Sequence, residues 1–130
     1  MKLASLWLIA TTLVLSACAH NTAGIALDSA GQVRVDNSSL AREISVTGIS
    51  SRMSADLLQA GALISSKVSS DLRLQYKFTW YDASGFTFED EASSWKSIKL
   101  HGKQQLQVNA IAPNAQATRF DIYVRETFSN

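Results

Sequence analysis

The fold class of this sequence follows from the stretch Leu-Arg-Leu-Gln-Tyr-Lys-Phe-Thr-Trp-Tyr at residues 72–81. Every second position, from Leu72 to Trp80, carries a large apolar side chain, and the positions between them are mostly polar. Successive side chains of a β-strand point to opposite faces of the sheet, so this alternation predicts a strand with one face in the core and the other in water.

The same period of two recurs in short segments on both sides of this strand. We expect further strands at Val33 and Val35, at Ile44 to Gly48, at Leu57 to Val68 with Ala60, Ala62 and Ile64 on one face, at Lys96 to Leu100, at Leu106 to Ala110, and at Phe120 to Val124. Polar turn residues separate the segments, and helical periodicity is sustained nowhere. Seven or eight short strands predict an all-β fold, an immunoglobulin-like antiparallel β-sandwich.

The connections are also predicted from turn residues. Ser69-Ser70-Asp71 is expected to join the third strand to residues 72–81 as a hairpin, and His101-Gly102 to close a second hairpin. Pro113 lies in a connection, where it removes no ladder hydrogen bond. Between Ser51 and Leu63 a second interpretation stays open, because Met53, Leu57, Leu58 and Ala62 are also spaced as in a helical turn.

The beginning of the chain has the pattern of a bacterial lipoprotein signal. Met1-Lys2 supplies a positive start, a largely apolar run extends from Leu3 to Val14, and Leu15-Ser16-Ala17-Cys18 follows at once. This resembles a lipobox, in which the thiol of the cysteine accepts the lipid. We therefore predict a cleaved signal peptide over residues 1–17 and lipidation of Cys18. The alternatives are an ordinary secretion signal with an incidental cysteine and a transmembrane helix, although the run is shorter than the roughly 20 residues that a spanning helix needs.

Lipidation would place the chain on a membrane facing the periplasm. Residue 19 is Ala rather than Asp, which would resemble an inner-membrane retention signal, so the outer membrane is favoured. Cys18 is the only cysteine, and the rest of the chain holds no disulfide. The small and polar residues that follow predict a flexible tether over 18–31, and the β-sandwich domain is expected over 32–130.

Composition and charge limit the function. The 130 residues, 46% hydrophobic and 18% charged, suit one domain. Without Lys2, which the signal peptide would remove, eleven basic and eleven acidic residues remain, so the predicted mature chain has no net charge. A nucleic-acid partner is not expected, because it would call for a basic excess.

A group of residues resembles a known family. Phe78-Thr79-Trp80-Tyr81-Asp82-Ala83-Ser84-Gly85, then Trp95, Ala112-Pro113 and the terminal strand around Arg119 are similar to the YcfL family of small lipoproteins of Gram-negative bacteria, over residues 33 to 126. The resemblance implies a periplasm-facing β-sandwich lipoprotein with no established activity. It implies no catalytic residue.

The candidate binding residues lie on the polar face of the strand at 72–81. Tyr81, with Lys77 and Thr79, is the aromatic side chain best placed to contact a partner through that sheet. Tyr81, Trp95 and Tyr123 all fall on outward faces and would form an aromatic patch for sugar rings or a protein. The other interpretation is structural, since wide rings often cover sheet edges.

The carboxylates suggest a second class of function. Glu89-Asp90-Glu91, with Asp82 nearby, would serve a glycosidase pair or a calcium loop, but the acidic run lacks the alternating spacing of calcium ligands. A solvated loop between strands is the preferred interpretation. His20 and His101 have no zinc-ligand spacing, and neither a Gly-x-Ser-x-Gly elbow nor a phosphate loop occurs. We therefore predict no catalytic residue, metal or cofactor. The leading hypothesis is a non-enzymatic envelope lipoprotein that binds an envelope protein or cell-wall partner; the alternative is an envelope enzyme, or an accessory to one, acting on glycan or peptide.

Overall fold

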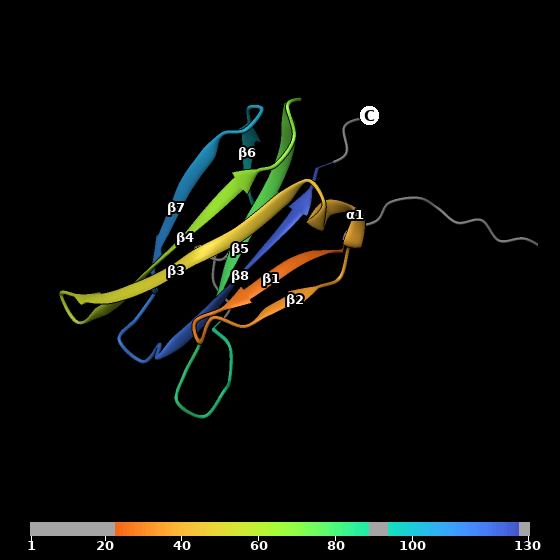
Figure 1. The fold of residues 1–130 in the computed structure, drawn as a ribbon. Helices are drawn as coiled ribbons and strands as arrows, with labels where there is room; N and C mark the ends of the chain where they lie inside the picture. Colours follow the sequence, from red (N-terminus) through yellow and green to blue (C-terminus); the bar gives the residue numbers. More distant parts are fainter. Residues whose placement is uncertain (1–22, 89–93, 128–130) are drawn as a thin grey trace, which may run out of the picture.

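The structure of the chain is a computed structural model that describes residues 23–88 and 94–127 (Figure 1). Within these ranges it contains eight strands and one short helix. They are β1 (Gly24–Asp28), β2 (Val33–Val35), α1 (Ser38–Ala41), β3 (Ile44–Ser54), β4 (Leu57–Ser66), β5 (Leu72–Tyr81), β6 (Lys96–Leu100), β7 (Gln105–Ile111) and β8 (Arg119–Glu126).

The strands form two antiparallel sheets. One has five strands in the order β2-β1-β8-β5-β6, and the other has three in the order β3-β4-β7. The smaller sheet lies across the larger one (Figure 1), and the apolar core lies between them. The predicted antiparallel β-sandwich of seven or eight strands is confirmed.

The five-stranded sheet supplies the largest side chains of the core. Every second residue of β5 is buried as the alternation predicts, and Trp80 is completely buried. In the neighbouring β8, Phe120, Ile122 and Val124 are buried in the same way. The ring centroids of Trp80 and Phe120 are 5.7 Å apart. The predicted inward faces of both strands are confirmed.

The three-stranded sheet contributes smaller side chains. Ala60, Ala62 and Ile64 of β4 are buried together, as predicted, and Val108 of β7 is buried beside them. Sandwich layers are separated by roughly 10 Å, so small residues on one sheet leave room for the aromatic rings of the other. The core is therefore filled unequally by the two sheets.

The start of the domain differs from the prediction. Residues 18–31 were expected to be a flexible tether, but Gly24–Asp28 form β1, which pairs with both β2 and β8. Ile25 and Leu27 are buried in the core. Two alternating apolar residues are too short a signal to indicate a strand, and pairing on both edges stabilises this one. The domain thus begins near residue 24 rather than 32.

Both predicted hairpin connections are wrong. Ser69–Asp71 lead from β4 to β5, and His101-Gly102 lie between β6 and β7, but each pair of strands is divided between the two sheets. Alternation indicates which face of a strand is buried and carries no information on its neighbour. The polar turns therefore cross between the layers.

The helical interpretation of Ser51–Leu63 is also wrong. This segment belongs to the β3–β4 hairpin, which turns at Ala55 and Asp56 with φ angles of 52° and 66°. Such positive φ values at both central residues match the twist of a tight hairpin. The short helix is α1 instead, where the Asn37 side chain caps the Leu40 N–H at 3.1 Å.

The predicted signal peptide and Cys18 lie outside the described residues. In the part of the chain that the structure describes, no helix combines the length and the hydropathy required to cross a bilayer.

Candidate functional site

The predicted binding residues lie on the outward side of the five-stranded sheet, where β5 and β8 are neighbours. The register pairs Lys77 with Tyr123, Thr79 with Asp121, and Tyr81 with Arg119. Because the alternate residues of both strands are buried in the core, these side chains point away from it. We call the outer face the set formed by Lys77, Thr79, Tyr81, Trp95, Arg119, Asp121, Tyr123 and Arg125.

Trp95 lies over the end of this face that carries Lys77, Tyr123 and Arg125, although it belongs to no strand. Its ring centroid is 3.7 Å from Cζ of Arg125 and 5.7 Å from Nζ of Lys77, and 6.2 Å from the ring of Tyr123 in an edge-on arrangement. Cations attract the faces of aromatic rings, and Trp is the ring they prefer. The indole is therefore held half-buried against the sheet by two basic side chains and a tyrosine.

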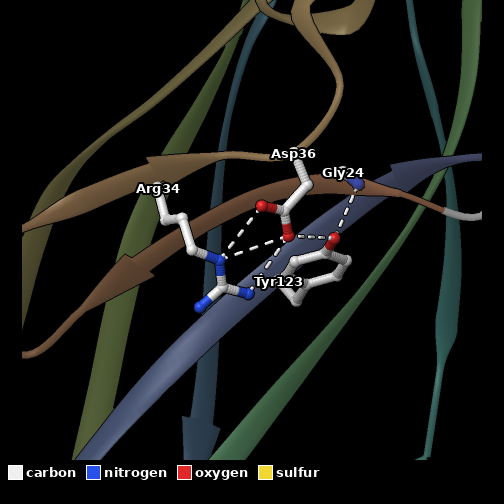
Figure 2. A network of polar contacts seen from close by, with 4 residues as sticks. All are labelled: Gly24, Arg34, Asp36 and Tyr123. Carbon is white, nitrogen blue, oxygen red and sulfur yellow. Dashed lines mark hydrogen bonds and ion pairs between the residues drawn. The ribbon is translucent and has the colours of Figure 1, made fainter.

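Tyr123 is fixed by a network of polar contacts that joins three strands (Figure 2). Its hydroxyl accepts a hydrogen bond from the Gly24 N–H at 2.7 Å and donates one to Oδ2 of Asp36 at 2.9 Å. Asp36 forms an ion pair with Arg34 at 3.1 Å, and Cζ of Arg34 is 5.9 Å from the tyrosine ring. The network ties the start of β1 to β8 and to the end of β2.

Electrostatics follow this geometry. Hydrogen bonds from Arg34 and then Tyr123 lower the pKa of Asp36, because both favour the ionised carboxylate. Burial raises the pKa of Tyr123, and the neighbouring Asp36 raises it further. At neutral pH the tyrosine therefore stays a hydrogen-bond donor to an ionised carboxylate.

Tyr81 is also engaged within the sheet. Its hydroxyl donates to Oδ2 of Asp121 at 2.9 Å, and Cζ of Arg119 is 5.2 Å from its ring centroid. Burial and the Asp121 carboxylate raise the pKa of Tyr81 to about 12. Burial also raises the pKa of Asp121. The hydroxyl proton is thus used by Asp121, and the ring remains the part of Tyr81 that is available to a partner.

The structure brings together most of the residues that the sequence suggested. Lys77 contacts Trp95, Tyr81 lies at the far end of the outer face, and the half-buried Thr79 lies between them on β5. Arg125 and Arg119 were not among the binding residues predicted from the sequence. Their outward position follows from the alternation of β8, but only the register shows that each lies over an aromatic ring.

The outer face carries an excess of unpaired basic groups. Within residues 23–88 and 94–127, Lys77, Arg119 and Arg125 form no ion pair with a carboxylate. The Arg125 Nε donates instead to the side-chain oxygen of Gln75 at 3.0 Å. Three cations supported by aromatic rings can therefore attract an acidic partner.

Asp82 is the one carboxylate of the alternative hypothesis that lies within the described residues. Oδ1 of Asp82 accepts the backbone N–H groups of Ser84 and Phe86, at 2.9 and 3.0 Å, which is the capping role of a turn residue. Glu89, Asp90 and Glu91 lie outside the described residues. His101 Nδ1 lies 3.3 Å from Asp71. In the described part of the chain, no group of three or more His, Cys, Asp or Glu side chains is arranged to hold a metal ion.

Comparison with known proteins gives a family and a fold. The model of the family DUF1425, described as a protein of unknown function, matches residues 31–126. A crystal structure of a DUF1425 family member from Shewanella sp. pv-4 is 53% identical in sequence, covers 82% of this chain and 99% of its own, and superposes with a TM-score of 0.62. Cj0090 of Campylobacter jejuni, 17% identical, covers 63% of this chain and 85% of its own with a TM-score of 0.54, a likeness of fold alone. No curated protein matches the chain.

Proposed function

We propose that this chain, which belongs to the DUF1425 family, is a periplasm-facing lipoprotein of the YcfL kind, and that its domain is a binding module rather than an enzyme. The outer face is the proposed contact surface. The partner we infer is an acidic envelope protein or cell-wall component.

The anchor is supported by the sequence. Leu15-Ser16-Ala17-Cys18 follows an apolar run, and only five residues separate Cys18 from the first strand at Gly24. The six residue steps from Cys18 to Gly24 span at most about 22 Å when fully extended. A lipid on Cys18 would therefore hold the start of β1 close to the bilayer, and Ala19 favours the outer membrane over the inner.

That tether would also orient the outer face. Gly24 pairs with Arg125 near the end of β8, and Arg119 and Tyr81 pair at the opposite end of the strands. Arg125 and Trp95 would then lie nearer the membrane, and Tyr81 farther from it. The face would extend from the bilayer towards the periplasm.

The observation that carries the binding function is the position of Trp95 against Arg125, Lys77 and Tyr123. Aromatic and arginine side chains provide much of the binding energy at protein interfaces, and rings that are already fixed lose little entropy on binding. Here Trp95, which lies just before β6, is combined with Tyr123 and Arg125 of β8, and all three side chains are only half-buried. The arrangement suits recognition of a flat, acidic surface.

Site-specific crosslinking in intact cells tests the contact surface. A photoreactive amino acid at Thr79 should crosslink an envelope partner, and the same group at Thr47, on β3 of the other sheet, is the matched control. Trp95→Ala and Tyr81→Ala should weaken the crosslink from position 79, and raised salt should weaken it further because the contact is electrostatic. Equal crosslinking from both positions, unaffected by Trp95→Ala, would contradict the proposal.

The anchor and the alternative are tested separately. Cys18→Ser should abolish labelling by a fatty-acid analogue and release any exported protein from the membrane; an unlabelled wild type would disprove the anchor. Replacing Glu89, Asp90 and Glu91 by their amides should leave crosslinking unchanged. A glycan- or peptide-cleaving turnover that disappears in this triple variant would favour the enzyme.

A further inference from the structure

A hollow of about 690 Å³ lies on the three-stranded sheet, on the opposite side of the sandwich from the outer face. Its floor is the row in which Ser51, Ala60 and Ala110 are paired across β3, β4 and β7. Ala60 is buried in the core, so the residues before and after it on each strand point outward and surround the floor. We call this site the Arg52 cup; the side chains used below are Ser50, Arg52, Gln59, Asn109 and Ile111, with Gly61 at its base.

Gly61 keeps the base of the cup open. Its φ is not positive, so its backbone conformation does not require glycine. A Cβ at this position would lie 2.9 Å from both Oδ1 of Asn109 and Nε2 of Gln107, and 3.0 Å from Oγ of Ser50. Glycine within a strand often marks a place where another group approaches closely. Here its missing side chain lets three polar side chains converge.

The groups left to face a ligand are mainly hydrogen-bond donors. Arg52 Nε donates to Oε1 of Gln59 at 2.7 Å, and Gln107 Nε2 donates to Oδ1 of Asn109 at 3.4 Å. Both side-chain amide oxygens therefore already accept a hydrogen bond. The terminal nitrogens of Arg52 and the amide nitrogens of Gln59 and Asn109 remain.

Arg52 is the charge of the cup. Among the described residues it has no carboxylate partner, and no acidic side chain lines the hollow. Its contact with Gln59 holds the guanidinium in one orientation, which leaves the two terminal nitrogens to bind two oxygens in parallel. On the other side, Ile111 is 53% exposed and offers an apolar contact.

We propose that the Arg52 cup binds a ligand that carries a carboxylate. The carboxylate pairs with the guanidinium of Arg52, its neighbouring polar groups accept hydrogen bonds from Gln59 and Asn109, and an apolar part rests on Ile111. This site is independent of the outer face, so either can fail without the other. A peptide with a free C-terminus and an acidic sugar both carry this chemistry.

Titration of the full chain in detergent micelles, followed by NMR of ¹⁵N-labelled protein, tests the proposal. The probes are N-acetyl-trialanine, its C-terminal amide, and D-glucuronate. We expect the free acid of at least one class to shift the Arg52 Nε–H and the Gly61 N–H signals, and the amide to shift neither. Shifts with N-acetyl-trialanine alone would identify a peptide carboxylate as the ligand, and shifts with glucuronate alone would identify a sugar acid. Shifts with both would show that the site requires only the carboxylate. No shift with either acid, or equal shifts with the amide, overturns the proposal.

Variants locate the binding. Arg52→Ala should weaken the affinity by about tenfold or more, because a charge-assisted pair is lost. The affinity of Arg52→Lys should lie between those of Arg52→Ala and the wild type, because lysine keeps the positive charge but cannot donate two parallel hydrogen bonds to one carboxylate. The control is Arg42→Ala, an exposed arginine outside the cup. Gly61→Ala should also weaken binding, and its amide spectrum shows whether the fold is kept. Wild-type affinity in Arg52→Ala would disprove the site whatever the result for Gly61.

Discussion

The two sheets of the sandwich differ in the size of the side chains on both of their faces. The five-stranded sheet carries large rings, with Phe78, Trp80 and Phe120 inward and Tyr81 and Tyr123 outward, whereas the three-stranded sheet has Ala60 and Ala62 inward and Ser50 and Gly61 outward. Inside, large and small residues complement each other across the core. Outside, the five-stranded sheet presents aromatic rings and the three-stranded sheet contains a hollow.

The outward side chains also differ in how firmly they are held. Tyr81 donates to Asp121, and Tyr123 bridges Gly24 and Asp36, so both rings are tied to neighbouring strands. Over Gly61 the contacts are made by the ends of amide and hydroxyl side chains. The outer face therefore presents rings that are tied to neighbouring strands. In the Arg52 cup the contact with Gln59 orients the guanidinium, and only the amide and hydroxyl ends over Gly61 are free to adjust.

The largest effect on stability is expected from a substitution in the core on the five-stranded sheet, which contributes the larger side chains. Trp80→Ala should lower the free energy of unfolding by roughly 3–5 kcal/mol, because it removes a completely buried ring from contact with Phe78 and Phe120. Thr79→Ala, one residue away on the outward face, should be close to neutral. Chemical denaturation measures both, and small, equal effects would mean that the faces of β5 are assigned in reverse.

The two strand glycines should respond differently to alanine. A Cβ at Gly24 would lie 1.9 Å from the backbone oxygen of Val124, whereas at Gly61 the nearest atoms are movable side-chain ends. We expect Gly24→Ala to lower the free energy of unfolding by about 1–3 kcal/mol, as for other forced overpacking, and Gly61→Ala by less. A larger loss of thermal stability in Gly61→Ala than in Gly24→Ala would contradict the assignment of rigid surroundings to Gly24 and movable side-chain ends to Gly61.

Removing a hydroxyl from each sheet sharpens the same contrast. Tyr123→Phe leaves the partly buried Gly24 N–H without its acceptor and should lower the free energy of unfolding by about 1–2 kcal/mol. Ser50→Ala, on the exposed side of the other sheet, should change it by less than about 0.5 kcal/mol. Hydrogen exchange at Gly24 gives a second measurement, and an unchanged rate in Tyr123→Phe would show that the bond does not protect β1.

The smallest effects concern two carboxylates of the five-stranded sheet. The pKa of Asp36 is lowered from 3.8, so its contribution to stability is complete above pH 3.8 and is lost as the pH falls through the lower folded value. The pKa of Asp121 is raised by burial, so its ionised form opposes folding at neutral pH and this opposition disappears as the pH falls through the raised value.

Urea unfolding at a series of pH values checks these signs. Asp36→Asn should be less stable than the wild type at neutral pH, and the difference should close in acid. Asp121→Asn, which keeps an oxygen to accept from Tyr81, should be at least as stable at neutral pH, with a difference that also closes in acid. Parallel pH profiles for the two variants would contradict the opposite environments of the two carboxylates.

Much of the fold could be predicted from local alternation. Residues 72–81 and 119–126 repeat with a period of two over a full strand, and burial of every second side chain follows directly. β1 could not be predicted, because Ile25 and Leu27 alone do not distinguish a strand from a linker. β1 is stabilised by pairing with β2, which has only three residues, and with β8, which is distant in sequence. Neither partner can be recognised from the residues around β1.

The candidate site was predictable in part for the same reason. Outward positions of Lys77, Tyr81 and Tyr123 follow from alternation, but their partners do not. Trp95 lies outside every strand, and Arg125 meets it only because β5 and β8 are neighbours in this register. The Arg52 cup was not foreseen, since it needs β3, β4 and β7 side by side and a glycine whose role appears only with its neighbours in place.

The sequence by itself determined the fold class, the buried face of the main strands, and the aromatic character of the outward face, because side-chain direction along a strand depends only on local geometry. The tertiary structure decided which strands pair, that the polar turns at Ser69–Asp71 and His101-Gly102 cross between sheets, and where Trp95 and Arg52 meet their partners. Strand pairing and these side-chain contacts depend on segments that are distant in sequence. The packing of large rings on one sheet against small residues on the other selects which of those segments come together.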